Sequence, residues 1–264
     1  MPKPGTYHVG VPCWVVLTTP DPARAQRFYG ALFDWEFVPT GPAGTVATRY
    51  GVQVAAVEPA RPVEPSGPSA VSARSGPSAV WTTFLACPDP PRTVATVRAA
   101  GGRSLREPYE VPELGRAALA VDPLGARFGL WQAGTVDGAG LVDEPGALAW
   151  NEHLSPDPGA ARAFYRRVFG YTYDRPRAGH ALARVAGLPA CSIGPGGPGD
   201  GARWLAHFAT EDTDRTAARL RALGGRVLGG PVPTPFGRTA LVRDDAGAEF
   251  VLVAVPARGS AAAA

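Results

Sequence analysis

A chain of 264 residues with 45% hydrophobic and 19% charged residues has the composition of a globular protein. The net charge of +3 comes from scattered arginines without a basic run, which argues against nucleic-acid binding. No apolar run approaches the roughly 20 residues that span a bilayer. Residues 1–10 hold one lysine and no hydrophobic stretch, so we expect no signal peptide, no membrane partner and a cytoplasmic protein.

The cysteines and the overall residue bias carry little functional signal. Cys13, Cys87 and Cys191 are odd in number, far apart and without a C-x-x-C spacing. We therefore expect buried, small hydrophobic side chains rather than redox or metal-binding groups. The abundance of Ala, Gly, Pro and Arg is typical of a GC-rich bacterial genome.

The first expected elements are a short strand over residues 13–18 and a helix that begins after Asp21. The carboxylate of Asp21 is suited to capping the helix, and Pro22 costs nothing at the first helical position. The side chains that form the apolar face of this helix are Ala25, Phe28, Tyr29 and Leu32. A β-type run over residues 52–57 follows.

A connector rich in Pro, Ser and Gly covers residues 61–78 and contains Ser-Gly-Pro-Ser-Ala-Val twice. This composition cannot supply a core, and we interpret it as a mobile linker rather than a binding loop. Beyond it, the pattern predicts a helix over residues 94–100 that ends at a Gly-Gly pair. Short strands are expected over residues 117–121 and 126–131.

The rest of the chain repeats these elements. Segments around residue 14 recur 136 residues later, and segments around residue 81 recur 123 residues later, an offset that becomes 122 near its end. A helix over residues 216–223 and a last strand over residues 249–255 complete the second half. The matched residues include Trp14 with Trp150, Asp21 with Asp157, Tyr29 with Tyr165, Trp81 with Trp204, and Asp122 with Asp244.

The repeat predicts four βαβββ units in two domains. The first domain covers residues 1–134, with units at 1–60 and 79–134, and the second covers 146–256. Residues 135–145 join the two, and residues 257–264 are expected to be a disordered tail.

These motifs resemble the vicinal oxygen chelate superfamily, which includes glyoxalase I, extradiol dioxygenases and the bleomycin and fosfomycin resistance proteins. The similar text is Pro-Asp-Pro followed by Ala-x-x-Phe-Tyr-x-x-x-Phe, and Gly-Arg-x-Ala-x-x-x-Asp-x-x-Gly-Ala, each present in both halves. The resemblance covers nearly the whole chain. It implies an α+β fold with two curved eight-stranded sheets, each surrounding a concave pocket, and helices on the outer face.

Members that use a metal bind it with a His or Gln on the first strand, a His on the first strand of the next unit, and a Glu on the last strand. The matching positions here are Trp14, Trp81 and Gly129 in the first half, and Trp150, Trp204 and Val251 in the second. None of these side chains ligates a cation, so the resemblance implies no metal and no cofactor. Classical glyoxalase or dioxygenase activity is therefore not expected.

Strand alternation extends each pocket inward from the tryptophans. The concave face of the first half is expected to hold Trp14, Val16, Thr18, Trp81, Thr83, Arg127 and Trp131. That of the second half is expected to hold Trp150, Glu152, Trp204, Phe208 and Glu249. The alternative is that the tryptophans pack in the core. His153 and His207 have the parity of the helix-packed face.

Glu152 is the candidate catalytic residue. Desolvation beside two indoles is expected to raise the pKa of its carboxyl and to suit it to general acid or base work. The alternative is a salt bridge, for example with Arg184. A buried carboxylate without a partner favours catalysis, whereas a paired one does not.

The expected pockets indicate a small-molecule binding function, with two alternatives. We expect a metal-independent protein that binds and sequesters a flat hydrophobic or aromatic small molecule of the natural-product or antibiotic type. The alternative is a metal-free cyclase, dehydratase or isomerase of natural-product biosynthesis that uses Glu152 as acid or base. A third possibility is that the two halves serve only as an interaction scaffold, in which case the concave pockets, here called cups, are filled by side chains. Four units can complete two pockets, so a monomer or a homodimer is expected.

Overall fold

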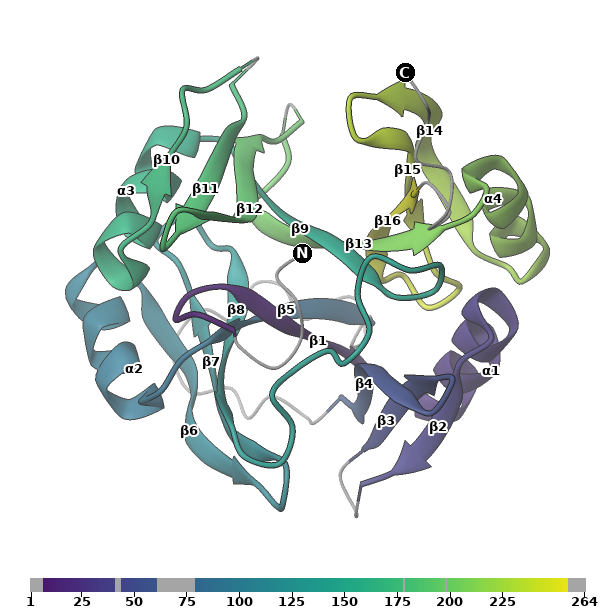
Figure 1. The fold of residues 1–264 in the computed structure, drawn as a ribbon, viewed down its shortest axis with the longest axis horizontal. Helices are drawn as coiled ribbons and strands as arrows, with labels where there is room; N and C mark the ends of the chain where they lie inside the picture. The colour runs from purple at the N-terminus through teal and green to yellow at the C-terminus, as the bar shows by residue number, and fades with distance from the viewer. Residues whose placement is uncertain (1–6, 41–43, 61–78, 178, 198, 256–264) are drawn as a thin grey trace.

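The computed structural model describes residues 7–40, 44–60, 79–177, 179–197 and 199–255 (Figure 1). Within these ranges the chain forms two eight-stranded sheets and four helices, which confirms the expected α+β class. The connector over residues 61–78 and the tail over residues 257–264 lie outside the described residues.

The first sheet joins two βαβββ units through its central strands. β1 pairs in parallel with β4 and antiparallel with β5, and the strand order is β2-β3-β4-β1-β5-β8-β7-β6. The elements are β1 (Pro12–Thr19), α1 (Pro22–Phe33), β2 (Glu36–Pro39), β3 (Thr45–Arg49), β4 (Val52–Pro59), β5 (Val80–Ala86), α2 (Pro90–Ala99), β6 (Arg103–Val111), β7 (Gly115–Val121) and β8 (Arg127–Ala133).

The second sheet repeats this topology, with the order β10-β11-β12-β9-β13-β16-β15-β14. Its elements are β9 (Leu148–Ser155), α3 (Pro158–Phe169), β10 (Thr172–Tyr173), β11 (Ala181–Val185), β12 (Leu188–Pro195), β13 (Arg203–Thr210), α4 (Thr213–Ala222), β14 (Arg226–Thr234), β15 (Gly237–Arg243) and β16 (Glu249–Ala254).

The helix starts follow from side-chain caps. The Asp21 carboxylate accepts a hydrogen bond from the Arg24 backbone N–H at 2.9 Å, and Asp157 accepts from the Ala160 N–H at 2.9 Å, as the sequence predicts. The second helix begins at Pro90, four residues earlier than expected, because Asp89 caps it in the same way. The first turn of this helix has too few apolar side chains for the helical pattern to be recognised in the sequence.

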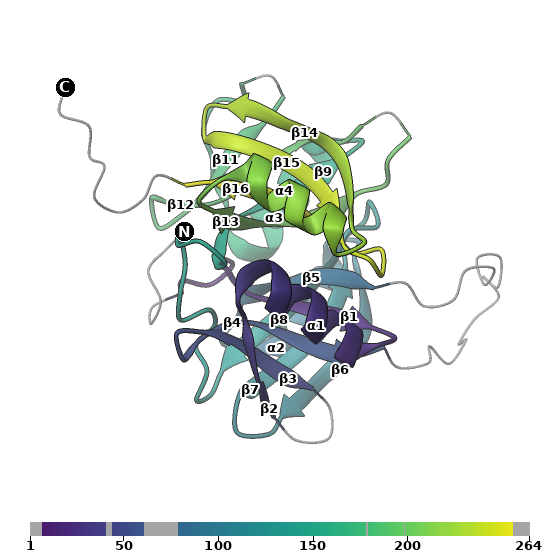
Figure 2. The ribbon, with the colours of Figure 1, turned by 90° about the vertical axis from the view of Figure 1, so that its right-hand side faces the viewer.

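The two sheets meet through their central strands β5 and β13, and they curve away from each other (Figure 1). Helix α1 lies beside α4 on one flank of this junction and α2 beside α3 on the other (Figures 1 and 2). The Thr83 hydroxyl donates to the Asn151 side-chain oxygen at 2.8 Å across the junction. Each helix-bearing face is therefore covered by the other half of the chain.

Side chains from both halves share the core at the junction. One cluster packs Tyr29 and Trp35 of the first half against Phe208 and Phe250 of the second. A related cluster packs Phe128 of the first half against Phe164 and Tyr165 of the second. The apolar area that these contacts remove from water holds the halves together.

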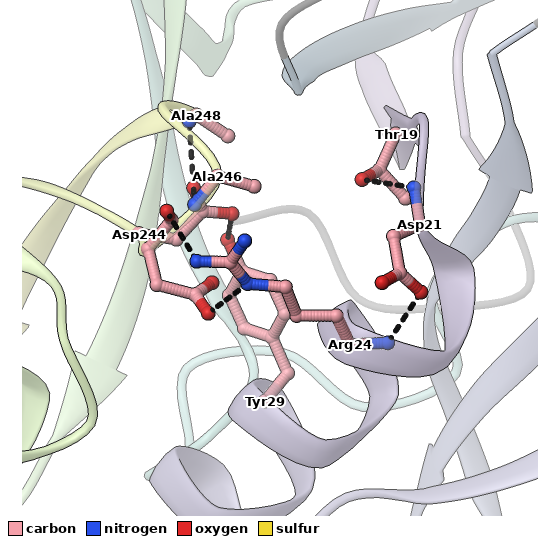
Figure 3. A network of polar contacts seen from close by, with 8 residues as sticks. Thr19, Asp21, Arg24, Tyr29, Asp244, Ala246 and Ala248 are labelled. Carbon is pink, nitrogen blue, oxygen red and sulfur yellow. Dashed lines mark hydrogen bonds and ion pairs between the residues drawn. The ribbon is translucent and has the colours of Figure 1, made fainter.

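A tyrosine from each half also reaches a buried aspartate of the other. The Tyr29 hydroxyl donates to Asp244 at 2.9 Å, and Arg24 pairs with the neighbouring Asp245 at 2.5 Å (Figure 3). In the symmetry-related place, the Tyr165 hydroxyl donates to Asp122 at 3.2 Å. There the carboxylate gains a further partner, since His153 Nε2 lies 2.8 Å from it.

Candidate functional site

The first cup is a partly open, largely apolar cavity of about 320 Å³ on the concave face of the first sheet. Trp14 pairs with Phe84 and Val16 with Thr82 across β1 and β5, so these four side chains share the concave face. Trp14, Phe84 and Trp131 are at most 5% exposed and form one wall. Val16, Val46 and Ala56 form the adjoining wall.

Two segments cover the mouth of the first cup. The hairpin of β6 and β7 contributes Tyr109 and Leu114 to the lining. The segment that follows β8 contributes Val136, whose carbonyl oxygen accepts a hydrogen bond from Trp131 Nε1 at 2.9 Å. The cavity is thus lined by side chains from the sheet, the hairpin and the connecting segment.

The donor set of the first cup does not fit a metal. Of the three expected ligand positions in this half, Trp14 and Gly129 lie on the concave face and Trp81 does not, and an indole or a glycine supplies no side-chain ligand. A Cβ on Gly129 would lie 2.2 Å from the Phe84 ring. The Phe84 ring therefore occupies the space that a last-strand glutamate requires.

Trp81 and Thr83 do not face the cup, so their expected orientation is wrong. Trp81 packs under the helices, where its Nε1 donates to the Tyr29 hydroxyl at 2.9 Å. Thr83 lies on the same face, at the junction with Asn151. Both faces of β5 are apolar, and sequence alternation cannot separate two apolar faces. The core-packing alternative is correct for Trp81.

Several polar side chains also line the first cup. Glu58 and Glu110 line the cavity, and Glu110 pairs with Arg116 at 3.2 Å. The Arg106 guanidinium lies 3.2 Å from the centre of the Tyr109 ring, a cation–π contact. Arg127 begins β8, two residues before Gly129, and is not among the residues that line the cavity.

The second cup holds a polar cluster around Glu152. Trp150 faces the cup, and its Nε1 donates to the Ser192 hydroxyl at 3.0 Å. Ser192 donates in turn to Glu152 Oε1 at 3.2 Å, and His180 Nδ1 lies 2.9 Å from the same oxygen. His207 Nε2 lies 3.7 Å from Glu152 Oε2.

These contacts reverse the expected titration of Glu152. Burial acts to raise the pKa of its carboxyl, but the His180 and Ser192 hydrogen bonds and the two histidine charges outweigh it, so the pKa lies below its ordinary value. The pKa of His180 is raised by its hydrogen bond to Glu152. Burial lowers the pKa of His207. Glu152 is thus an ionised, paired carboxylate at neutral pH, and the expectation of a raised pKa is wrong.

Several other expected features of the second cup are corrected. Trp204 and Phe208 face the helices, where Trp204 Nε1 donates to Tyr165 at 2.8 Å and Phe208 packs on Trp81. His207 faces the cup instead, because it pairs with Trp150 across the strands. His153 is on the helix-packed face, as expected. Arg184 pairs with Asp174 at 2.8 Å rather than with Glu152.

Glu249 lies on the concave face but is held by two arginines. Arg203 Nε is 3.5 Å from one carboxylate oxygen, and Arg243 donates to the other. This carboxylate is therefore a neutralised part of the second cup. The spacing of residues in the sequence does not predict the contact of Arg203 with Glu249. It does not predict the contact of His180 with Glu152 either, because His180 lies outside the strands.

The remaining expectations concern metals, cysteines and membranes. Over the described part of the chain, no three His, Cys, Asp or Glu residues are arranged to hold a metal. All three cysteines are free, and their predicted burial is confirmed. Among the described helices, none has the length and apolar character needed to cross a membrane.

Comparison with known proteins decides the family. The profile of the glyoxalase-like domain matches residues 14–131 and again residues 152–253. The chain belongs to the glyoxalase-like family. It is a tandem member of the vicinal oxygen chelate superfamily, which confirms the resemblance.

Relatives of this glyoxalase-like protein include CFP32 of Mycobacterium bovis, a proposed glyoxylase, which is 37% identical over 95% of this chain and 97% of its own. The anthracycline biosynthesis protein DauV of Streptomyces sp. strain C5 is 34% identical over 92% and 93%. The DnrV protein of Streptomyces peucetius, also an anthracycline biosynthesis protein, is 33% identical over 92% and 93%.

Solved structures share the fold at low sequence identity. The Mn(II)-bound glyoxalase of Novosphingobium aromaticivorans superimposes with a TM-score of 0.62 at 17% identity, over 94% of this chain and 83% of that one. The 2,3-dioxygenase LapB of Pseudomonas sp. KL28 gives 0.62 at 14%, over 93% of each chain. At these identities the likeness concerns the fold, not the chemistry.

Proposed function

We propose that this protein binds a flat hydrophobic or aromatic small molecule, of the natural-product or antibiotic type, and sequesters it in the first cup. The observation that carries the proposal is the cavity of about 320 Å³ lined by Trp14, Phe84 and Trp131. Small-molecule sites are concave, mostly apolar and a few hundred cubic ångströms in volume.

The lining favours a planar ligand. Three aromatic side chains come from three neighbouring strands on one wall, and aliphatic side chains stand on the next. Offset stacking on such rings adds about 1 kcal/mol per contact to the burial of apolar area. Two relatives are named for anthracycline biosynthesis, and anthracyclines contain a flat fused-ring system that suits this lining.

The test is a titration of tryptophan fluorescence with 2-(hydroxymethyl)anthraquinone, a neutral planar probe. We expect saturable quenching, because two of the six tryptophans line the cavity. Trp14→Phe should weaken binding about fivefold, the equivalent of ~1 kcal/mol. Trp150→Phe, a matched change in the second cup, should leave the affinity unchanged.

Two results would contradict the proposal. One is the absence of saturable quenching by planar aromatic probes. The other is an equal loss of affinity in Trp14→Phe and Trp150→Phe, which would take the site out of the first cup. Mass spectrometry of the bound probe, recovered unchanged, separates sequestration from conversion.

A metal-free cyclase, dehydratase or isomerase that uses Glu152 is the second candidate. The observation that favours it is an ionised carboxylate beside Trp150 and His207 in the second cup, able to accept a proton. Its pairing with His180 and its lowered pKa argue against a general-acid role. Conversion of a probe that disappears in Glu152→Gln would establish this candidate and displace the first.

We also propose that the protein acts in the cytoplasm as a monomer or a homodimer. Each sheet completes its own cup from one chain, so neither site requires a second copy. Light scattering on the eluted protein tests the oligomeric state, and a larger assembly would contradict it.

A further inference from the structure

The second cup holds an indole that the core does not cover. Trp150 is half-buried, whereas its counterpart in the repeat, Trp14, is 4% exposed and belongs to a hydrophobic cluster. In the described part of the chain, Trp150 belongs to none of the hydrophobic clusters. Its Nε1 donates to the Ser192 hydroxyl, which fixes the ring on the concave face. Part of the indole surface is therefore accessible to a ligand.

A carboxylate lies beside this indole. Glu152 follows Trp150 by two residues on β9, so both side chains are on the concave face. The Ser192 hydroxyl links them, since it accepts from Trp150 Nε1 at 3.0 Å and donates to Glu152 Oε1 at 3.2 Å. The Glu152 side chain is 18% exposed, so a solute can approach it.

The other charges of this face balance one another without Glu152. Glu249 forms ion pairs with both Arg203 and Arg243, and Arg203 also pairs with Asp200. Two carboxylates and two guanidinium groups thus cancel. Within the described ranges, the ion pairs of Glu152 are formed with histidines and not with arginines.

The charge of Glu152 is offset mainly by one histidine that solvent reaches. His180 is 44% exposed, and its Nδ1 lies 2.9 Å from Glu152 Oε1 while its ring packs over Gly194 of β12. His207 Nε2 lies 3.7 Å from the other oxygen, but burial lowers the pKa of His207, so this ring is mostly uncharged at neutral pH. As the pH rises and His180 loses its proton, the second cup gains an excess negative charge.

An accessible indole next to a carboxylate suits a cation. The face of an aromatic ring attracts a positive charge, and tryptophan does so most strongly. A cation against Trp150 would also approach the opposite charge of Glu152. The repeat places Val16 of the first cup at the position of Glu152, so only the second cup combines the two groups.

We propose that the second cup binds an organic cation, with an ammonium group against the Trp150 indole and the Glu152 carboxylate as its counter-charge. The bound cation takes over the role of the charged His180 ring, so the ligand competes with the proton on His180. This site is separate from the proposed site in the first cup and does not depend on binding there.

The experiment compares two probes of the same shape that differ by one positive charge. Choline and its neutral analogue 3,3-dimethylbutan-1-ol are titrated into the full-length protein by calorimetry. We expect choline to bind about fivefold more tightly, and the NMR signal of the Trp150 indole N–H to shift when it binds. Glu152→Gln should remove the preference, and Trp150→Leu should weaken choline binding severalfold. Glu36→Gln removes an exposed carboxylate of β2 and is the charge-matched control, with no expected change.

The pH dependence gives a second measurement, which keeps the test decisive if Glu152→Gln fails to fold. Choline keeps its charge at every pH. The pKa of His180 lies above its ordinary 6.5, so His180 is charged at pH 6.5 and loses that charge as the pH rises. Choline should therefore bind about twofold or more tightly at about pH 8.5 than at pH 6.5. His180→Gln should strengthen binding at pH 6.5 and remove the difference between the two pH values.

Four results would overturn the inference. The first is the absence of saturable choline binding, and the second is equal affinity of the wild-type protein for choline and its neutral analogue. The third is a preference for choline that survives in Glu152→Gln, or an unshifted Trp150 signal, since either would place the cation elsewhere. The fourth is an affinity that does not change with pH, which would show that His180 and the ligand do not compete.

Discussion

The two cups descend from one repeat but differ at the positions that decide their chemistry. Both keep a tryptophan on the first strand, Trp14 or Trp150. On the facing strands, the first cup has the pair Phe84 and Gly129, and the second has His207 paired with Val251. An aromatic ring over a glycine makes one cup apolar, while the histidine leaves the other polar around Glu152.

The coverings of the cups differ as well. In the first half, the β6–β7 hairpin folds over the mouth and Leu114 lines the cavity. The repeat places Phe236 at the corresponding point of the second half, where it is 85% exposed. The same supersecondary unit therefore gives one cup a lining side chain, Leu114, and places the equivalent Phe236 in solvent.

The largest expected effect comes from breaking the ring-over-glycine pair. Gly129→Ala places a Cβ against the Phe84 ring and should lower the free energy of unfolding by about 3 kcal/mol through overpacking. Val251→Ala, at the matching position, should cost about 1–2 kcal/mol through lost burial. Denaturant titration measures both.

The double variant Phe84→Ala with Gly129→Ala sharpens this result. Relief of the clash predicts a cost smaller than the sum of the two single changes, as expected for residues in contact. Strict additivity would show that the ring does not rest on Gly129.

The next effect lies at the junction of the halves, where the two buried aspartates differ. Asp122 accepts from Tyr165 and lies against His153, whereas Asp244 accepts from Tyr29 without a histidine. Asp122→Asn should therefore destabilise the protein by about 2–3 kcal/mol, and by more than Asp244→Asn does. Thermal unfolding of the two variants in parallel checks the order, and a larger loss in Asp244→Asn would contradict it.

A smaller, pH-dependent effect is expected from Glu152 and His180. The pKa of Glu152 lies below its ordinary 4.5, so its stabilisation exists above that pH and is lost as the pH falls. The pKa of His180 lies above its ordinary 6.5, so its contribution exists below that pH and is lost as the pH rises. The Glu152 carboxylate and the His180 imidazolium are therefore both charged, and stabilise each other, between about pH 4.5 and pH 6.5.

Glu152→Gln should thus cost at most about 1 kcal/mol, mainly near pH 5–6, because His180 is half-exposed and the pair is screened. The NMR titration of His180 should shift back toward its ordinary pKa. Asp174→Asn removes an exposed pair nearby and should leave that titration unchanged. An unchanged His180 titration in Glu152→Gln would show that the contact is absent in solution.

The smallest expected effect is a gain of affinity in the first cup. Glu58 places a carboxylate in the cavity lining, so Glu58→Gln should tighten binding of a negatively charged planar probe, anthraquinone-2-carboxylate, about two- to fivefold. The neutral probe should be unaffected. A matched gain for both probes would mean that Glu58 acts by size rather than by charge.

The sequence was sufficient for the four units and for the first helix of each half. The capping carboxylates of Asp21 and Asp157 stand where the repeat places them, and the apolar face of the first helix holds the expected side chains. Such features are local, since a cap and a helical face depend on residues within one or two turns. Trp14 and Trp150 face their cups because each lies at the same distance along the chain from the helix that follows the first strand.

The orientation of the second strand in each unit was not predictable in this way. Trp81 and Trp204 lie one residue away from cup-facing positions, and a shift of one residue exchanges the faces of a strand. The burial of β5 on both sides removes the polar alternation that would have revealed the shift. The partners of Glu152 come from distant residues, and the pairing of His180 with it depends on tertiary packing alone.

The exchange of tyrosines across the junction has a consequence for how the chain unfolds. Helix α1 packs against Phe208 and Phe250 of the second half. Helix α3 packs against Phe128 of the first half, so each half contributes to the core of the other. A half on its own would present this interior to solvent instead of a finished surface. We therefore expect the duplicated architecture to unfold as one cooperative unit, with a single calorimetric transition for the two copies.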